Sequence, residues 1–444
     1  MDTICANASH PGGAICVIRV SGNNAIGITN RMFRSTRNKD LTLMRGYTVH
    51  FGQIVDSGGT VIDDALVIVY CAPHSYTGEE ATEIMCHGSA YIVQRIIEML
   101  IAQGCRMARP GEFTERAFVN GKMDLSQAEA VADLIAASNA ASHRLAMSQM
   151  RGGFSKELGH LRHQLLEMTS LLELEIDFSE EDVEFADRQQ LLTLARDIHS
   201  IIERLINSFR IGNAIKNGIP VAIIGPTNAG KSTLLNALLH DERAIVSDIH
   251  GTTRDSIEGT ITIQGITFRF IDTAGIRDSV DQIEQIGIER SWRKAQEAEI
   301  VLVMTDQPTI DIDLATLSDK YVIKVYNKAD IVDYPTLYDT PNSIVISAKH
   351  GTNIDHLEQM LVDASNINKV EDSDIIVTNI RHVEALQKAL ESITTVEQQL
   401  TDGITGDIIA LDLHACIDAL AEIVGDVTNE DTLQSIFSRF CVGK

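Results

Sequence analysis

The sequence has 444 residues, of which 44% are hydrophobic and 22% are charged, and its formal net charge is -25. This length exceeds one ordinary hydrophobic core and predicts about three globular domains, not a disordered chain. The negative charge opposes general steering towards nucleic acid, so a contact with RNA needs a local basic patch or a partner protein.

No stretch approaches the roughly 18 apolar residues of a membrane-spanning helix, and the start MDTICANASH has neither the basic nor the apolar region of a secretory signal. We therefore expect a cytoplasmic protein without a membrane partner. The seven cysteines are scattered without Cys-x-x-Cys spacing, so they predict neither a zinc site nor a disulfide framework.

Residues 1–118 carry short apolar runs, AICVIRVSG and VIDDALVIVYCAP, followed by the helical pattern AYIVQRIIEMLIAQG, which ends at Gly104. This mixture predicts an α+β domain. Residues 119–216 are rich in helix formers, as in AEAVADLIAAS and ARDIHSIIERLINSFR, and predict a helical region. Its acidic stretch at 173–187 is interpreted as a solvated connection between helices.

Residues 217–371 alternate between strands and helices, with the strand patterns IPVAIIG, FRFIDTAG, IVLVMTD, YVIKVYNKAD and SIVISAK. Apolar strands joined by helices predict a parallel, doubly wound sheet covered on both faces. Residues 372–444 return to helix. The predicted fold class is multidomain, with an N-terminal α+β domain, a discontinuous helical domain, and an α/β domain inserted into it.

A phosphate-binding loop is predicted at GPTNAGKS, which follows an apolar strand and opens a helix. Gly225 and Gly230 allow backbone amides to turn towards phosphates, Lys231 reaches the β- and γ-phosphates, and the hydroxyl of Ser232 ligates Mg²⁺. The nucleotide contacts expected here are Asn228, Ala229, Gly230, Lys231, Ser232 and Thr233.

The segment NKAD, at the end of a strand, identifies the base. The carboxylate of Asp330 accepts hydrogen bonds from the ring N–H and the amine of guanine, whereas adenine has no donor at these positions. GTP is therefore predicted over ATP. The residues expected to contact the base are Asn327, Lys328, Ala329, Asp330, Ser347, Ala348 and Lys349.

Two further segments complete the predicted nucleotide site. In the polar loop SDIHGTTRD, one of Thr252 and Thr253 completes the Mg²⁺ shell, and the residues alone do not say which. In DTAG, Asp272 fits the outer Mg²⁺ shell and the amide of Gly275 senses the γ-phosphate. The expected nucleotide contacts are Ser247, Asp248, Ile249, His250, Gly251, Thr252, Asp272, Thr273, Ala274 and Gly275.

Ile276 follows DTAG, at the position where Ras-like switches carry a water-orienting Gln, and its side chain can neither donate nor accept a hydrogen bond. Hydrolysis needs a positioned water and positive charge near the transferring phosphoryl group. Three substitutes remain open on the residues alone: Arg254 or Arg277 as an internal arginine finger, a bound cation, or a polar residue such as Glu284.

Taken together with SYTGEEATEIMCHG, RPGEFTERAFVNGKMDLSQAEAV and the tail FSRFCVGK, these motifs resemble the MnmE (TrmE) family of tRNA modification GTPases over essentially the whole chain. The resemblance implies a folate-binding and dimerisation domain at 1–118, a helical domain at 119–216 and 372–444, and a Ras-like G domain at 217–371. A homodimer is expected.

The resemblance also implies the reaction and its partners. With an MnmG-type flavoprotein, in a heterotetramer or larger complex, the chain forms the aminomethyl or carboxymethylaminomethyl group at carbon 5 of the tRNA wobble uridine. The one-carbon unit comes from 5-formyl- or methylene-tetrahydrofolate, while FAD and NADH belong to the partner.

Further site residues follow from the resemblance. A potassium ion takes the place of an arginine finger, held by Asn228, Ser247, Ile249 and Thr252, which leaves Thr253 with Ser232 for Mg²⁺. Glu284 orients the attacking water. The folate residues are Arg19, Glu83, Lys122 and Lys444, and Cys441 is a catalytic residue of open chemical role. The segment HPGGA (10–14) is shorter than the PPGRGG of many members.

Two other functions are weighed. A ribosome-assembly GTPase switch predicts a basic RNA-binding module beside the G domain, which the net charge does not favour. A folate-dependent transferase with a vestigial G domain conflicts with the presence of Lys231, Ser232, Asp272, Asn327 and Asp330.

Overall fold

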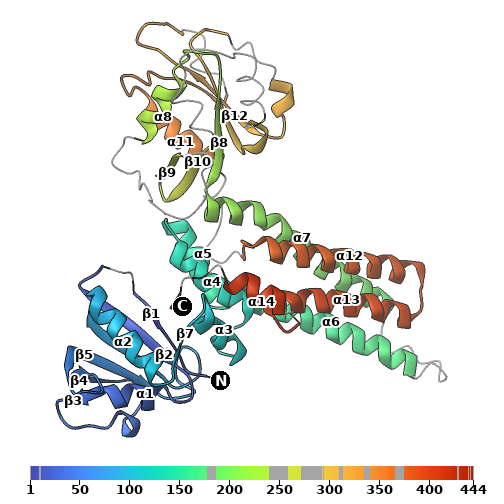
Figure 1. Cartoon of the computed structure of the whole chain (residues 1–444). Helices are drawn as coiled ribbons and strands as arrows, with labels where there is room; N and C mark the ends of the chain where they lie inside the picture. Colours follow the sequence, from blue (N-terminus) through green and yellow to red (C-terminus); the bar gives the residue numbers. More distant parts are fainter. Residues whose placement is uncertain are drawn as a thin grey trace. The chain divides into compact units, whose positions relative to one another are not determined.

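The structure is a computed structural model, which describes residues 2–9, 12–177, 187–239, 259–271, 293, 295–309, 314–334, 341–365, 375–427, 430–438, 440 and 442–443. Figure 1 shows the elements of the chain, which divides by its internal contacts into two compact units. The first comprises Met1–Ile135, Ser148–Ala186 and Ile404–Lys444, and the second comprises Ala136–Met147 and Asp187–Gly403. Each unit is described by itself.

The N-terminal part of the first unit is a seven-stranded sheet in the order β3-β4-β5-β6-β2-β1-β7, in which only the pairing of β1 with β7 is parallel. Helices α1 (Ala25–Met32) and α2 (Ala90–Ala102) pack on one face over Ile18 and Ile84. The strands are β1 (Ile4–Asn7), β2 (Ile15–Ser21), β3 (Phe33–Ser35), β4 (Thr48–Val55), β5 (Val61–Tyr70), β6 (Ala81–His87) and β7 (Arg106–Met107).

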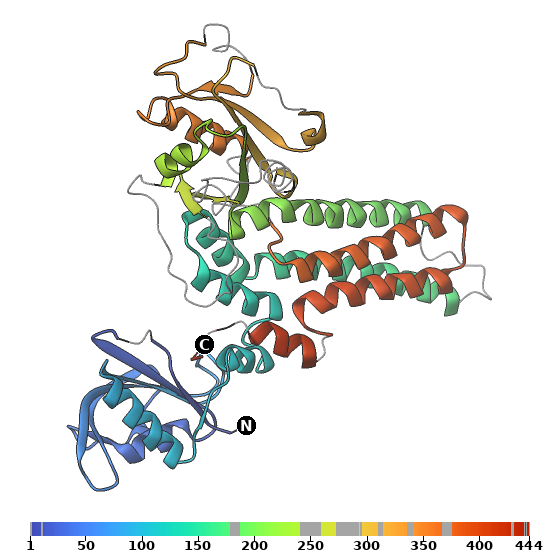
Figure 2. The ribbon, with the colours of Figure 1, turned by 45° about the horizontal axis from the view of Figure 1, so that its top comes forward.

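The remaining elements of the first unit are helical. Helices α6 (Gly153–Asp177) and α13 (Gly406–Val424) run alongside one another (Figure 2). The acidic stretch begins inside α6, because Glu173–Asp177 are helical, and residues 178–186 lie outside the described part. The other helices are the short 3-10 helix η1 (Leu41–Leu43), α3 (Glu112–Val119), α4 (Leu125–Ala136) and α14 (Glu430–Phe437), while α5 (Ala140–Met150) begins in the second unit.

The second unit combines two long helices, α7 (Arg188–Asn217) and α12 (Ile380–Asp402), which pack on each other, with a six-stranded sheet. The sheet order is β13-β12-β11-β8-β10-β9. Its elements are β8 (Ile219–Ile224), α8 (Lys231–Leu239), β9 (Gly259–Ile263), β10 (Ile266–Phe270), β11 (Ile300–Thr305), the 3-10 helix η3 (Leu314–Leu317), β12 (Tyr321–Tyr326), β13 (Ser343–Val345) and α11 (Ile354–Ala364).

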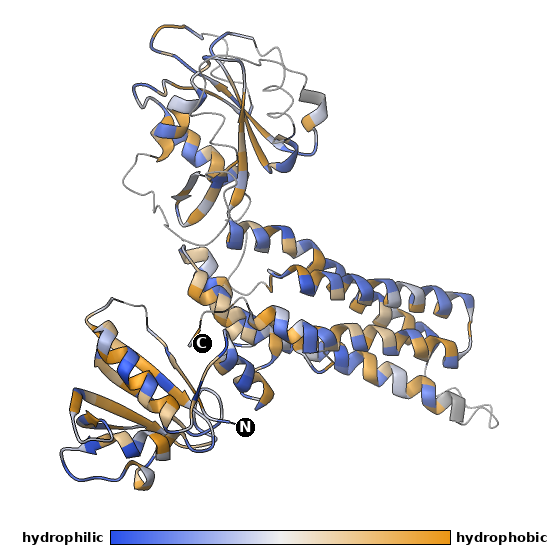
Figure 3. Ribbon diagram, in the orientation of Figure 1, coloured by the Kyte–Doolittle hydropathy of each residue, from blue (hydrophilic) through white to orange (hydrophobic). Residues whose placement is uncertain are grey.

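The sheet of the second unit departs from the expected all-parallel pattern at one edge, where β9 and β10 form an antiparallel hairpin. The turn residues Gln264 and Gly265 both have positive φ, +50° and +82°, which matches the twist of a two-residue hairpin. The central strands are apolar along their length (Figure 3), and β11 is buried at every position. A strand that is buried on both faces of a sheet has to be apolar at nearly every position. The predicted multidomain α/β and α fold class is confirmed.

Within the part of the chain that the structure describes, no helix combines the length and the apolar character needed to span a membrane.

Candidate nucleotide site and N-terminal cluster

The loop between β8 and α8 carries the predicted phosphate-binding segment. Asn228 and Gly230 have φ of +65° and +100°, and a Cβ on Gly230 would collide with the side-chain amide of Asn327. The ammonium group of Lys231 donates to the carbonyl oxygens of Gly225 and Pro226, at 2.8 and 2.7 Å. Burial lowers the pKa of Lys231. A tight loop ending in a helix N-terminus, with a cation against it, is suited to polyphosphate.

Asn327 connects the three described segments of the predicted site. Its Nδ2 donates to the carbonyl of Ala229 in the phosphate-binding loop at 2.8 Å, and its Oδ1 accepts from the backbone N–H of Ala348 at 3.0 Å. Its own backbone accepts from the hydroxyl of Tyr334 at 2.6 Å and donates to Thr305. Because Asn327 is only 3% exposed, these bonds are sheltered from water and fix the three segments together.

Asp330 lies at the edge of this site with an ionised carboxylate. The hydroxyl of Ser347 donates to its Oδ1 at 2.7 Å, and this hydrogen bond lowers the pKa of Asp330. A carboxylate has about four acceptor positions, so one bond from Ser347 leaves others for a base. An anionic acceptor matches the two adjacent N–H donors of guanine.

Neighbouring side chains hold the backbone of this segment. Lys328 has φ of +64°, and its ammonium group lies 2.6 Å from Oδ2 of Asp306, directly after β11. Asp306 was not among the predicted site residues. Its position could have indicated it, because in α/β sheets the site forms at the carboxyl ends of the strands. Nothing in the local pattern marks Tyr334, because its bond to Asn327 depends on how the segment after β12 turns back.

The residues present fit a nucleoside triphosphate with Mg²⁺. Ser232 lies in the first turn of α8, next to Lys231, where its hydroxyl would hold the ion that neutralises phosphate charge. Thr233 is exposed on the same turn. The remaining predictions for hydrolysis lie outside the described residues: Ser247, Asp248, Ile249, His250, Gly251, Thr252, Thr253, Arg254, Asp272, Thr273, Ala274, Gly275, Ile276, Arg277 and Glu284.

In the first unit, two of the predicted folate residues meet across the sheet. Arg19 on β2 and Glu83 on β6 are directly opposite, and the guanidinium approaches Oε1 of Glu83 at 2.9 Å. The hydroxyl of Tyr70 donates to Oε2 of Glu83 at 3.1 Å. Burial and then the charge of Glu83 raise the pKa of Tyr70 to about 12, so its phenol remains a hydrogen-bond donor. Tyr70 was missed because strand register is not visible in sequence.

The tail of the chain reaches the same pair. Arg19 donates to the carbonyl of Gly443 at 3.2 Å, and Val442 forms a backbone bridge with Pro110. Gly443 has φ of +97°, and a Cβ there would collide with the carbonyl of Asn7 at the end of β1. This close approach requires glycine. The predicted residues Cys441 and Lys444 lie outside the described residues.

Lys122 lies apart from this pair. Its ammonium group donates to the carbonyl of Pro73 at 3.0 Å, and it makes no polar contact with Arg19 or Glu83 in the described part of the chain. A hollow of about 500 Å³ opens near it. The residues lining the hollow are Asn23, Ala72, Gly78, Glu79, Glu80 and Asn120.

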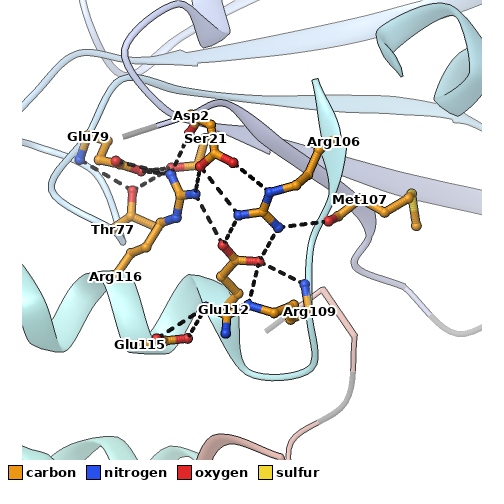
Figure 4. Close-up of polar contacts among 10 residues, drawn as sticks. All are labelled: Asp2, Ser21, Thr77, Glu79, Arg106, Met107, Arg109, Glu112, Glu115 and Arg116. Carbon is orange, nitrogen blue, oxygen red and sulfur yellow. Dashed lines mark hydrogen bonds and ion pairs between the residues drawn. The ribbon is translucent and has the colours of Figure 1, made fainter. Parts of the chain in front are cut away.

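Glu79, which lines that hollow, belongs to an ionic network centred on the buried side chains of Arg116 and Glu112, whose contacts are drawn in Figure 4. Arg116 on α3 donates to Glu79 at 3.1 Å, to Glu112 at 3.2 Å and to Asp2 at 2.7 Å. Arg106 binds Glu112 and Asp2 from the other side. Burial opposes ionisation of Glu112, but the hydrogen bonds from the arginines outweigh it and lower its pKa to about 2.

Replacing Arg116 by methionine is expected to destabilise this network by about 3–5 kcal/mol, because Glu79 and Glu112 are 8% and 2% exposed and would lose a shared cation. Amide hydrogen exchange of β1 would measure the loss, with Arg95→Met as the control, since Arg95 pairs with Asp56 and Glu98 and has no contact with this network. Equal protection in the two variants would contradict the prediction.

The same network sets a pH dependence. The folded pKa of Glu112, about 2, lies below its ordinary value of 4.5. Its stabilising contribution is therefore complete above pH 4.5 and is lost as the pH falls towards 2. We expect exchange protection of β1 to decrease across this window in the wild type and to decrease less in Glu112→Gln. Parallel profiles would count against the assignment.

The described part of the site has a phosphate-binding loop, and Asn327 links this loop to the segment that carries the Asp330 carboxylate, which fits guanine. On a doubly wound sheet, this arrangement defines a P-loop GTPase. Residues 3–122 match the model of the GTP-binding protein TrmE N-terminus, and 125–441 match that of the MnmE helical domain. The chain belongs to the MnmE family of tRNA modification GTPases and is a GTP hydrolase.

Relatives cover the chain from end to end. It is 56% identical to the tRNA modification GTPase MnmE of Bacteroides thetaiotaomicron, over 100% of this chain and 99% of that protein. It is 54% identical to the protein of the same name from Parabacteroides distasonis, over 100% of each chain. For that of Flavobacterium johnsoniae the identity is 49%, over 100% of this chain and 99% of the relative. Family membership favours a tRNA modification GTPase over a ribosome-assembly switch.

Proposed function

We propose that this GTPase acts on tRNA, together with a flavin-dependent partner of the MnmG type, to form the aminomethyl or carboxymethylaminomethyl group at carbon 5 of the wobble uridine. The observation that carries the proposal is the 56% identity, over the full chain, with a tRNA modification GTPase. The proposal assigns the folate role to 1–118, the helical link to 119–216 and 372–444, and hydrolysis to 217–371, in the cytoplasm.

The direct test is nucleoside analysis of tRNA by mass spectrometry. Cells that lack this protein are expected to lose the aminomethyl-type wobble uridines, and the wild-type chain is expected to restore them. A variant with Lys231→Ala should fail to restore them if hydrolysis drives the modification. An unchanged nucleoside profile in the deleted strain would refute the proposal.

Hydrolysis is proposed to depend on potassium, held by Asn228, Ser247, Ile249 and Thr252, with Glu284 orienting the water. The support is Ile276, whose apolar side chain cannot aim a water, together with the family resemblance. We expect GTP turnover in KCl to exceed that in NaCl at equal ionic strength by at least tenfold, the order of a lost stabilising charge. Equal rates in the two salts would exclude the cation, and a fully active Glu284→Ala variant would exclude the glutamate.

The folate site is proposed to include the Arg19 and Glu83 pair, with Lys122, Lys444 and the tail. The carboxylate of Glu83 is an acceptor for the amino edge of a pterin, and cations suit the glutamyl carboxylates. Glu83→Gln keeps the size of the side chain but removes its charge, and it is expected to weaken binding of 5-formyl-tetrahydrofolate in calorimetry, whereas exposed Glu98→Gln is not. Equal affinities would remove Glu83 from the site.

A homodimer through the N-terminal sheet is proposed from its uncovered face. Val49, Phe51 and Leu66 are 58%, 52% and 38% exposed. Phe51 lies opposite Leu66, which lies opposite Met85 on the next strand, so the apolar surface is continuous. Such a surface favours a self-complementary interface. Sedimentation is expected to give a dimer for the wild type and a monomer for Phe51→Glu; a dimeric variant would exclude this face.

A further inference from the structure

A basic segment lies at the outer edge of the N-terminal sheet. Between residues 31 and 45 there are five basic side chains and one acidic side chain, Asp40, whereas the whole chain has 37 Lys and Arg against 62 Asp and Glu. We call this segment the basic edge. Its five cations are all exposed: Arg31, Arg34, Arg37, Lys39 and Arg45. They follow one another through the end of α1, the edge strand β3, and the turns on either side of η1.

These cations are not neutralised by neighbouring acids. Arg31 donates to Gln103, at 2.8 Å to the side chain and 3.2 Å to the backbone. In the described part of the chain, the side chains of Arg34, Arg37, Lys39 and Arg45 form no ion pair or hydrogen bond. The one acid, Asp40, accepts from the backbone and hydroxyl of Thr42 instead. The basic edge is therefore a local positive surface on a chain of opposite charge.

An exposed aromatic side chain stands beside the cations. Tyr47 is 69% exposed and has φ of +60°, a backbone conformation that is uncommon for a residue with a bulky side chain. Its ring packs edge-on against Tyr70 with centroids 5.7 Å apart, which holds the ring in place. Arg45 precedes Tyr47 by two residues, and its backbone carbonyl accepts from the hydroxyl of Thr48 at 2.7 Å, so this cation of the basic edge lies next to Tyr47 along the chain.

Protection of a sheet edge against pairing does not explain this arrangement. One charge on a short edge strand is enough to discourage pairing with another chain, and β3 has only three residues. Arg34 alone lies on β3, while Arg37, Lys39 and Arg45 lie in the turns that follow it. Protection of the sheet edge therefore does not explain the charges outside β3 or the exposed ring of Tyr47.

We propose that the basic edge and Tyr47 form a contact surface for the RNA substrate, with phosphates against the cations and an unstacked base on the ring of Tyr47. This inference rests on the proposed action on tRNA. Cations that follow a phosphate backbone, beside an aromatic ring on which a base stacks, are the two components by which proteins hold single-stranded RNA. RNA is favoured over duplex DNA because a paired base is not available to the ring.

Binding of a fluorescently labelled tRNA transcript to the full-length chain would test the proposal, measured by anisotropy from 50 to 300 mM KCl. The variant Arg34→Ala/Arg37→Ala/Lys39→Ala is expected to bind about tenfold or more weakly, and the slope of log K against log salt should decrease by roughly 2–3. The matched control Arg144→Ala/Arg151→Ala/Lys156→Ala removes the same charge from exposed positions on α5, in the turn after it and on α6, and is expected to bind like the wild type.

The aromatic contribution is tested separately. Tyr47→Ala is expected to weaken tRNA binding by roughly five- to tenfold or more, since one stacked base contributes on that order, and Tyr47→Phe is expected to retain binding. Neither change should alter GTP turnover without tRNA. Variants that fail to fold are recognised by circular dichroism, and for those the milder Arg37→Gln/Lys39→Gln pair replaces the triple variant.

Several outcomes would overturn the proposal. One is that the triple variant binds tRNA with unchanged affinity and unchanged salt slope. If the variant also aggregates in light scattering, the basic edge serves to prevent the sheet edge from pairing with another chain. Equal affinity for duplex DNA of the same charge would exclude a preference for RNA. If the wild type and the triple variant both restore tRNA modification in cells that lack the protein, only this contact surface is excluded. If cells that lack the protein keep the modification, the proposed function itself is refuted.

Discussion

Replacing Lys231 by alanine is expected to reduce GTP hydrolysis by roughly 10²–10³-fold, the order observed when one preorganised charge or donor is removed from a transition state. The ammonium group of Lys231 lies against the carbonyls of Gly225 and Pro226 and is sheltered enough for its pKa to be lowered. No other described basic side chain donates to the backbone of this loop. Among the described residues, no neighbouring cation can take over this charge.

Single-turnover hydrolysis with saturating GTP would measure this effect separately from nucleotide release. Lys156→Ala, an exposed lysine on α6, removes the same charge without touching the loop and should leave the rate unchanged. A Lys231→Ala variant within threefold of the wild type would show that the phosphate-binding loop has been assigned wrongly.

Asp330→Asn should change the base specificity of the enzyme. An ionised carboxylate pairs with the two N–H donors of guanine, whereas an amide presents its own N–H donors to one of them. We expect kcat/KM for GTP to fall by at least roughly 10²-fold, because sites built to hydrogen-bond a group discriminate strongly when the pairing is lost. Xanthosine triphosphate carries a carbonyl in place of the exocyclic amine, so the variant should use it better than the wild type does.

Hydrolysis of GTP and of xanthosine triphosphate in competition, by one preparation of each enzyme, would measure this change of nucleotide preference. Asp319→Asn provides a matched control, because the side chain of Asp319 is 70% exposed and its contact is with Lys320. If the preference for GTP survives in Asp330→Asn, another group reads the base, and the acceptor role of Asp330 must be given up.

Local pattern predicts most of the fold because each strand of the second unit carries its own signal. The run IVLVMT is apolar up to its last residue, YVIKVY is interrupted only by Lys324, and each is followed by a polar residue, which indicates both the strands and the edge where the site forms. The antiparallel β9 was not predicted, because the turn at Gln264 and Gly265 lacks the usual Asn-Gly signal.

The candidate site is predictable only where one segment carries the chemistry. GPTNAGKS and NKAD are readable as short motifs, but the bond from Asn327 to Ala229 joins residues 98 positions apart. The same applies to Arg116, which meets Asp2 and Glu79 only after α3 packs on the sheet. Sequence also did not separate Lys122 from the pair of Arg19 and Glu83, since contact across a sheet depends on register.

The packing of Gly443 against Asn7 has a consequence for biosynthesis. Residues 404–444 belong to the same compact unit as residues 1–135, so the earliest strands leave the ribosome long before their last packing partners are made. Val442 and Gly443 complete their contacts only after translation of this region ends. During synthesis Arg19 therefore lacks the carbonyl of Gly443, and a nascent chain interrupted before residue 404 would expose an unfinished first unit to proteases and chaperones.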